Sequence, residues 1–286
     1  MQPVAWLNPG MTLSSSNPSR TDRQADPLRA EAEQPIASAL VGSLRVQTYG
    51  SRQALAHASS SDIHRALTEC LARQNRARLI LAAAPSQAEM LAELAQSADV
   101  DWSRVTLFHM DEFIGLPAEA PQRFAAWLDR HFFAKVPQAE CHKIVPEPAP
   151  EAAAERYAAL LSEDGIDIVC LGIGVNGHIA FNDPPVADFD DPQDVKVVEL
   201  DRTCRLQQVD DQGFSSLDQV PTHAVTLTIP RLLRAHKLFC CVPGAHKAEA
   251  VKQCLTGPVS TEWPASILRT HRDCTLYLDK DANPDV

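Results

Sequence analysis

The chain has 286 residues, of which 45% are hydrophobic and 22% are charged, as in an ordinary soluble globular protein. Its 26 lysines and arginines against 37 aspartates and glutamates give a formal net charge of −11, so its surface repels nucleic acid and anionic membranes. No apolar run approaches the roughly 20 residues that span a bilayer, and the N-terminus lacks the features of a secretory signal. These features predict a cytoplasmic protein with neither a nucleic-acid nor a membrane partner.

The eight cysteines give no sign of a metal or disulfide site. Several lie in apolar, strand-like runs, where a thiol behaves as a small hydrophobic side chain. There is no C-x-x-C pair and no H-E-x-x-H motif, and the cysteines and histidines show no ligand spacing. We therefore predict a protein without a bound metal.

Residues 1–30 are rich in Ser, Pro, Asn and Arg and show no hydrophobic period, which predicts a poorly structured N-terminal extension. The segment 44–50 is typical of a strand. Apolar residues at helical spacing predict a helix over residues 51–74, with Ser61 as a cap for its second part.

The rest of the chain alternates strands and helices without a repeat or a long linker. This pattern predicts a single α/β domain over residues 31–286, with a doubly wound, mostly parallel, Rossmann-like sheet and helices on both faces. Residues 166–174 form the most strand-like run, because they are apolar apart from Asp167, as a parallel strand covered on both faces requires. Further strands are predicted over residues 78–86, 104–113, 223–230, 236–244 and 274–279, and helices over residues 86–98, 123–136, 150–164 and 245–257.

Acidic residues follow one of these strands. Ligands of open parallel sheets bind beyond the carboxyl ends of the strands, so the residues after each strand are candidates for a site. Asp111 and Glu112 follow a strand that is predicted to end near Met110. Acidic residues also commonly open loops or cap helices. A carboxylate delivered to this rim by a buried strand is nevertheless a candidate general base if burial brings its pKa toward the working pH.

The stretch LGIGVNGHIAFNDPP, residues 171–185, breaks an apolar run with three glycines. Glycine permits a close approach of the backbone to a ligand, and Gly177 directly precedes His178. With Asn176 and Asp183 within reach to fix its tautomer, this histidine is a candidate proton carrier. The G-x-G-x-x-G spacing is also that of a dinucleotide fingerprint. We reject that interpretation because the two prolines that follow oppose a helix.

In the stretch LAAAPSQAEM, residues 81–90, a strand turns directly into a helix. The amides at the start of such a helix would point at the ligand and could hold a phosphate. Ala84, Pro85, Ser86 and Gln87 are therefore candidate substrate-binding residues. An ordinary turn capped by Ser86 explains the same pattern equally well.

Together these motifs resemble the glucosamine-6-phosphate deaminase (isomerase) family, which is related to the 6-phosphogluconolactonases. The resemblance covers roughly residues 45–280 and preserves the order and spacing of four motifs. It implies conversion of glucosamine 6-phosphate and water to fructose 6-phosphate and ammonia, without a metal or an organic cofactor. The four motifs are FHMDEFIGLP, GIGVNGHIAFNDPP, PGAHKAEAV and GPVSTEWPASILRTH.

The resemblance also implies a role for individual residues. His178 would carry a proton to the ring oxygen as the sugar ring opens, with Asn176 and Asp183 orienting it. Asp111 would move a proton from C2 to C1, and Lys247 would face the phosphate. Aldose–ketose chemistry of this kind is served better by two groups of different pKa than by one.

Two residues beside the histidine depart from the family. An aspartate is frequent at the position of Asn176, although asparagine also occurs there. A glutamate is usual at Asp183, and the shorter side chain draws the carboxylate back by about 1.5 Å. We expect this change to lengthen its hydrogen bond to His178.

The phosphate loop departs further. The family's loop is glycine-rich, of the type Pro-Thr-Gly-Gly-Thr-Pro, and an arginine usually lies where this chain has Asp210. We expect Arg205, Glu112 and Gly177 to contribute to substrate binding. The substrate could be another amino-sugar phosphate, or a sugar without the usual phosphate placement.

Three other functions compete with this interpretation. Lactone hydrolysis, as in 6-phosphogluconolactonases, needs only water activation by His178, but the sequence GHIAFND favours the deaminases. A sugar-phosphate-sensing regulator would carry a helix-turn-helix segment, which residues 1–44 do not offer. A catalytically altered sugar-phosphate-binding protein is compatible with the changed phosphate loop. The sequence leaves the oligomeric state open, with a homo-oligomer among the options.

Overall fold

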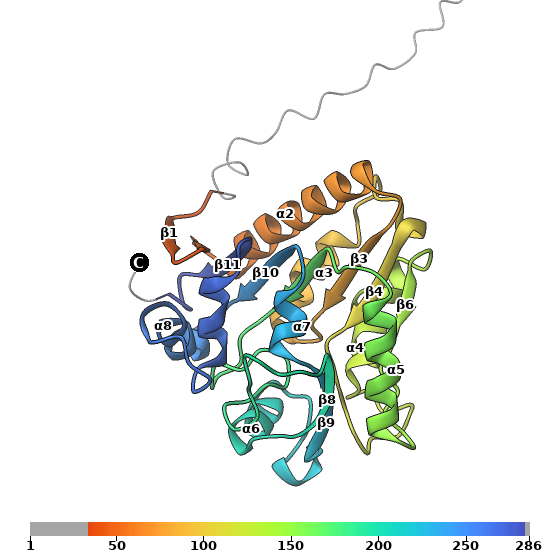
Figure 1. Cartoon of the computed structure of the whole chain (residues 1–286). Helices are drawn as coiled ribbons and strands as arrows, with labels where there is room; N and C mark the ends of the chain where they lie inside the picture. The colour runs from red at the N-terminus through yellow and green to blue at the C-terminus, as the bar shows by residue number, and fades with distance from the viewer. Residues whose placement is uncertain (1–33, 284–286) are drawn as a thin grey trace, which may run out of the picture.

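The fold is built around one large sheet. A computed structural model describes residues 34–283, and its centre is an eight-stranded sheet (Figure 1). The strands are β1 (Ala37–Val41), β2 (Leu44–Tyr49), β3 (Ala77–Leu81), β4 (Val105–His109), β6 (Glu140–His142), β7 (Ile168–Leu171), β10 (Lys237–Val242) and β11 (Cys274–Asp279). Their order is β1-β2-β11-β10-β7-β3-β4-β6. Only β1 is antiparallel to its neighbour, so the predicted mostly parallel α/β sheet is confirmed.

Helices cover both faces of this sheet. In β7, Val169 and Leu171 belong to one buried cluster and Ile168 and Cys170 to the other, because successive side chains of a strand point to opposite faces. Helices α5 (Pro150–Ser162), α7 (Ile229–Leu233) and α8 (Ala248–Thr256) pack on the first cluster. Helices α2 (Arg52–Arg73), α3 (Ala88–Leu94) and α4 (Phe124–His131) pack on the second. The central strand is therefore apolar throughout, as its sequence predicts.

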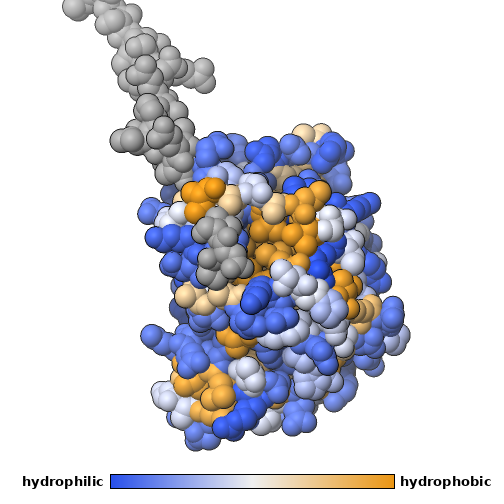
Figure 2. Space-filling view, turned by 90° about the vertical axis from the view of Figure 1, so that its left-hand side faces the viewer, coloured by the Kyte–Doolittle hydropathy of each residue, from blue (hydrophilic) through white to orange (hydrophobic). Residues whose placement is uncertain are grey.

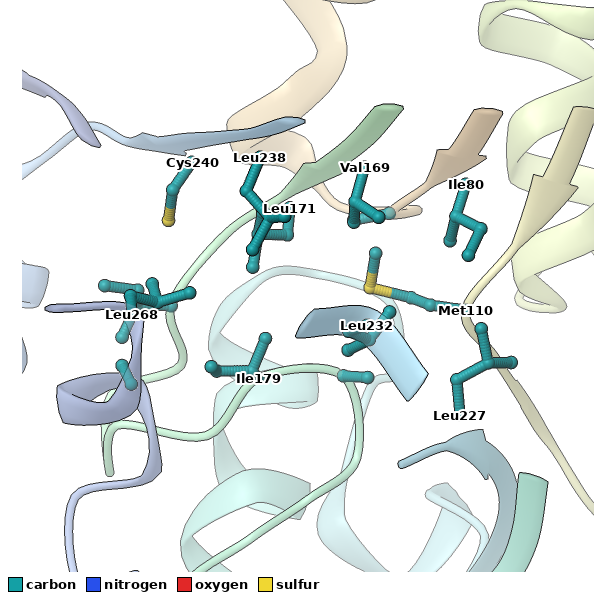
Figure 3. Close-up of a cluster of buried hydrophobic side chains, with 14 of the residues drawn as sticks. Ile80, Met110, Val169, Leu171, Ile179, Leu227, Leu232, Leu238, Cys240 and Leu268 are labelled. Atoms are coloured by element: carbon teal, nitrogen blue, oxygen red, sulfur yellow. The ribbon is translucent and has the colours of Figure 1, made fainter. Parts of the chain in front are cut away.

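The first cluster also holds the loop that follows β7. Figure 3 shows Val169 and Leu171 of the sheet facing Leu232 of α7, with Ile179 of this loop beside them. Ile179 is 1% exposed, and burial of such a side chain stabilises a fold by about 1.5–3 kcal/mol. The core thus anchors the residue that directly follows His178.

A second, smaller sheet was not predicted. It contains β5 (Asp111–Phe113), β9 (His223–Leu227) and β8 (Val195–Glu199) in that order, all antiparallel. The predicted strand over residues 104–113 divides at Met110, whose carbonyl accepts a hydrogen bond from the Leu227 amide at 2.8 Å. The chain leaves the large sheet there, because its next residues pair with β9 instead.

The predicted cap at Ser61 is wrong. Helix α2 is continuous and begins after Ser51, whose side chain accepts a hydrogen bond from the Ala54 amide. The serines within α2 do not interrupt the helix. The Ser59 hydroxyl, for example, donates to the Leu55 carbonyl at 2.8 Å, one turn earlier.

Two strand–helix connections have the same form. A 3₁₀ turn, η1 (Pro85–Gln87), joins β3 to α3, and another, η5 (Ala245–Lys247), joins β10 to α8. Strand β7 lies between β3 and β10, and all three are parallel, so both turns lie at the carboxyl ends of the strands, on either side of β7. Ser86 does not cap α3; its Oγ accepts a hydrogen bond from Gln87 Nε2 at 2.9 Å.

The side of the molecule that carries the outer strand β1 is mainly hydrophilic, with separate hydrophobic patches (Figure 2). Leu40 of β1 is among the exposed apolar side chains, at 69% exposure. None of the helices within residues 34–283 is long and apolar enough to cross a membrane. The extension predicted over residues 1–30 lies outside the described residues.

Candidate active site

A cavity of about 470 Å³ opens at the carboxyl ends of the parallel strands. Its wall includes the residue directly after β4 (Met110), after β7 (Gly172) and after β10 (Pro243). This is the place where ligands of open parallel sheets bind. The predicted site residues that line it are Ala84, Pro85, Ser86, Asp111, His178 and Lys247.

A tight loop presents His178 to the cavity. The Gly174 amide donates to the His178 carbonyl at 2.9 Å, which folds the loop back on itself. An ideal Cβ at Gly174 would lie 2.1 Å from the imidazole, so no larger residue fits beneath the ring. This glycine therefore serves the placement of the histidine rather than a phosphate.

The inner edge of the His178 ring is held by two side chains. Its Nδ1 lies 2.7 Å from Asn176 Oδ1 and 3.1 Å from Asp183 Oδ1. Both oxygens are acceptors, so Nδ1 carries the proton, and Nε2 of this cavity-lining residue makes no hydrogen bond within residues 34–283. Asn176 and Asp183, which were expected to orient the histidine, both contact it. The aspartate reaches Nδ1 although its side chain is shorter than the glutamate that is usual in the family.

Asp183 is itself fixed as an anion. It accepts hydrogen bonds from Asn176 Nδ2 at 3.0 Å and from the Asp201 amide at 3.1 Å. Burial alone would raise the pKa of Asp183, but the contacts to His178, Asn176 and Asp201 bring it below its usual value. A buried anion next to the imidazole stabilises the protonated ring.

Asp111 faces the same cavity from the second sheet. It is the first residue of β5 and is only 6% exposed. Burial, with a smaller contribution from the neighbouring charge of Glu112, raises the pKa of Asp111 well above its usual value. A carboxylate shifted in this direction is better suited to removing a proton near neutral pH.

Glu112 points away from the cavity, contrary to its prediction as a substrate-binding residue. Its carboxylate accepts hydrogen bonds from the amides of Phe113, Phe124 and Ala125 at 2.9–3.0 Å. Two of these amides lie at the start of α4, where a negative charge is favourable. Alternation along β5 explains the difference, because Asp111 and Glu112 must face opposite sides of a strand.

Two further predicted residues lie outside the cavity wall. Arg205 donates to the carbonyls of Leu217 and Val220 at 2.7 and 2.8 Å, so its guanidinium stabilises a turn. Gly177 adopts a φ of +81°, and a Cβ there would lie 2.8 Å from the Trp263 ring. We correct both assignments to structural roles.

The turn η1 brings Ser86 to the cavity and buries Gln87 behind it. Gln87 Nε2 donates to the Cys241 carbonyl at 3.1 Å and to Ser86 Oγ. A Cβ at Gly172 would lie 3.2 Å from the same Nε2. Gln87 thus fixes the turn from inside, and Ser86 is the side chain of the pair that a ligand can reach.

Lys247 is the main cation at this end. It is 5% exposed, and burial lowers the pKa of its ammonium group although the charge of Asp211 opposes this shift. Sequence reasoning missed Arg52, which lines the cavity and donates to the Pro85 carbonyl and to Glu89. Its position at the start of α2, three residues after the end of β2, was a usable signal. The other polar lining residues that were missed are Gln122, Arg130, Asp211, Gln212 and His246.

One group within the described residues has the donor types of a metal site. Atoms of His178, Asp183 and Cys204 lie within 4.8 Å of one another, and all three residues are buried. His178 and Asp183 already share hydrogen bonds with Asn176. His178 and Asp183 therefore fit a proton-carrying histidine and its support as they stand.

Residues 50–277 match the family described as "Glucosamine-6-phosphate isomerases/6-phosphogluconolactonase". The matched segment contains every one of the site residues above. The fold and the site therefore define a sugar-phosphate enzyme of the α/β class. The chain belongs to the glucosamine-6-phosphate isomerase/6-phosphogluconolactonase family, as its motifs indicate.

Two relatives of known name are glucosamine-6-phosphate deaminases. The one from Halothermothrix orenii is 36% identical over 196 residues, which cover 67% of this chain and 79% of the relative. The one from Listeria innocua is 38% identical over 205 residues, covering 71% and 84%. The similarity thus extends over most of each relative.

Solved structures show the same fold. A monomeric glucosamine-6-phosphate deaminase has a TM-score of 0.75 and 28% identity, covering 83% of this chain and 98% of its own. The 6-phosphogluconolactonase from Trypanosoma brucei has a TM-score of 0.70 and 17% identity, covering 87% and 100%. The second similarity concerns the fold alone.

Proposed function

We propose that this protein catalyses the isomerising deamination of an amino-sugar phosphate, converting glucosamine 6-phosphate or a close analogue and water to the ketose phosphate and ammonia. One observation carries the proposal: Asp111 and His178 reach a single cavity from different elements, each with an environment that suits a separate proton transfer. The names of the relatives support the same reaction.

Ring opening is assigned to His178. Its Nδ1 proton is held by Asn176 and Asp183, so Nε2 exchanges a proton with the ring oxygen. The Asp183 anion stabilises the imidazolium that forms when Nε2 holds the proton. The histidine can therefore both receive and return that proton during one turnover.

Isomerisation is assigned to Asp111. Its carboxylate removes the proton from C2 of the open-chain sugar and returns it to C1, through an enolamine intermediate, which leaves an imine at C2. Water adds to this imine carbon and ammonia leaves, which gives the ketose. The raised pKa of Asp111 supports this role, because a more basic carboxylate is a stronger acceptor for a carbon-bound proton.

The phosphate is assigned to the end of the cavity formed by η1 and Lys247. Ser86 offers a hydroxyl, and Lys247 and Arg52 offer positive charge. A buried ammonium attracts an anion more strongly than an exposed one, because solvent screens it less. We further propose a cytoplasmic location, since all eight cysteines are free thiols.

The test is a pair of assays on the purified protein. Release of ammonia from glucosamine 6-phosphate is measured beside hydrolysis of 6-phosphogluconolactone. We expect ammonia and fructose 6-phosphate in equal amounts, with no acceleration of lactone hydrolysis. Lactone hydrolysis without ammonia release would assign the protein to the other branch of its family.

A further inference from the structure

The end of helix α6 (Arg202–Asp210) carries an acid into the part of the cavity that faces Lys247. Asp211, the residue that follows the helix, lines the cavity wall. Its charge acts on the Lys247 ammonium, although the two side chains do not form an ion pair among the described residues. An anion beside the main cation is unexpected at a site for a phosphate dianion.

The Asp211 carboxylate is held in a defined position. Its Oδ2 accepts a hydrogen bond from Gln207 Nε2 at 3.1 Å. Gln207 Oε1 in turn accepts from the Val175 amide at 2.9 Å, in the loop that carries His178. Gln207 is only 9% exposed, and its two hydrogen bonds link the acid to the loop that carries His178.

One oxygen and one ammonium remain for a ligand. Asp211 Oδ1 and Lys247 Nζ make no hydrogen bond within residues 34–283. A ligand group between them must accept from the lysine and donate to the aspartate. A hydroxyl group does both, whereas a phosphate dianion can only accept.

We propose that Asp211 determines substrate specificity by accepting a hydrogen bond from a sugar hydroxyl that also contacts Lys247, and that its negative charge weakens binding of the phosphate dianion. The inference deepens the proposed function and rests on the ligand being a sugar. The ammonium of Lys247 has three donor hydrogens, so it serves this hydroxyl and the phosphate on the Ser86 side together. The substrate is then recognised more through its hydroxyls than through its phosphate.

The neighbouring acid provides a matched control. Asp210 is exposed and lies outside the cavity wall, so Asp210→Asn removes the same charge one residue away. The dissociation constants of glucosamine 6-phosphate and of glucosamine are measured by calorimetry for Asp111→Asn, which lacks the proposed base and leaves the sugar unconverted, and for the same variant with Asp211→Asn or Asp210→Asn added. Thermal unfolding of each protein checks its fold, and Asp211→Ser provides a second neutral variant.

We expect Asp211→Asn and Asp211→Ser to raise the affinity for the phosphorylated sugar, relative to the unphosphorylated one, by about tenfold. Asp210→Asn should leave that ratio unchanged. The proposal fails if the ratio is unchanged or falls in the Asp211 variants, if Asp210→Asn raises it equally, or if neither sugar binds any variant. Because binding is measured without turnover, a protein that binds but releases no ammonia refutes only the proposed reaction.

Discussion

Asp183 Oδ1 lies 3.1 Å from Nδ1 of His178, five residues earlier in the chain. The loop between them turns at Ala180, which is held at a φ of 50°, in the left-handed region that a residue with a Cβ seldom adopts. Such a conformation costs on the order of 1–3 kcal/mol and persists only where surrounding contacts enforce it. Burial of Ile179 and the hydrogen bonds of Asp183 are those contacts.

Replacing Asp183 with Asn should reduce kcat by about 10²-fold and leave KM nearly unchanged. The amide cannot stabilise the imidazolium of His178, yet it fills the same space. Ammonia release measures the effect. Asp190→Asn, an exposed change in the same loop, is the control and should have wild-type activity. Equal kcat values for the two variants would argue against a role of Asp183 in proton transfer.

Replacing Gly174 with Ala should displace the His178 ring, because the new Cβ would lie 2.1 Å from it. We expect activity to fall by at least about 10²-fold, as a misplacement of about 1 Å can cause. Gly165→Ala is the matched control, since its Cβ meets no atom closer than 4.0 Å. An active Gly174→Ala protein would show that the imidazole can act from another position.

Replacing Glu112 with Gln should lower the free energy of unfolding by about 1–3 kcal/mol, because an amide group cannot accept all three backbone hydrogen bonds and leaves one buried N–H unpaired. Chemical denaturation measures the change. Glu119→Gln, at an exposed position, should have no effect. A large rise in KM with unchanged stability would restore Glu112 as a substrate-binding residue.

The pH dependence of kcat/KM should have an acid limb set by Asp111. This carboxylate acts as a base only when ionised, and its pKa is raised, so activity falls as the pH drops through a value well above 3.8. The charge of Glu112 contributes to the shift, and Glu112→Gln should therefore move the acid limb to lower pH. A limb that stays in place, or moves to higher pH, contradicts this assignment.

The local sequence was sufficient to predict the loop that carries His178. His178 and the two residues that hold it lie within eight positions of one another, so the chain needs only one turn to bring them together. The strand before this loop is equally plain in the sequence, because both of its faces are buried. The large sheet and its loops were predictable for these reasons.

The direction in which single side chains point was not predictable from the sequence. Glu112 follows Asp111, yet the strand turns it to the opposite side, and the sequence does not give the strand that begins there. Arg205 lies on α6, where one residue changes the direction by about 100°. Which face of a helix meets the cavity depends on distant contacts, here with Leu217 and Val220. For the same reason Asp211, and not Asp210, lines the cavity.

The most direct test of the account is exchange of the C2 proton of glucosamine 6-phosphate with solvent deuterium, followed by nuclear magnetic resonance. The wild type should exchange this proton. Asp111→Asn should not exchange it, while its melting temperature stays close to that of the wild type and it still binds the sugar. Exchange at equal rates in the two proteins would contradict the assignment of Asp111 as the base and, with it, the proposed mechanism.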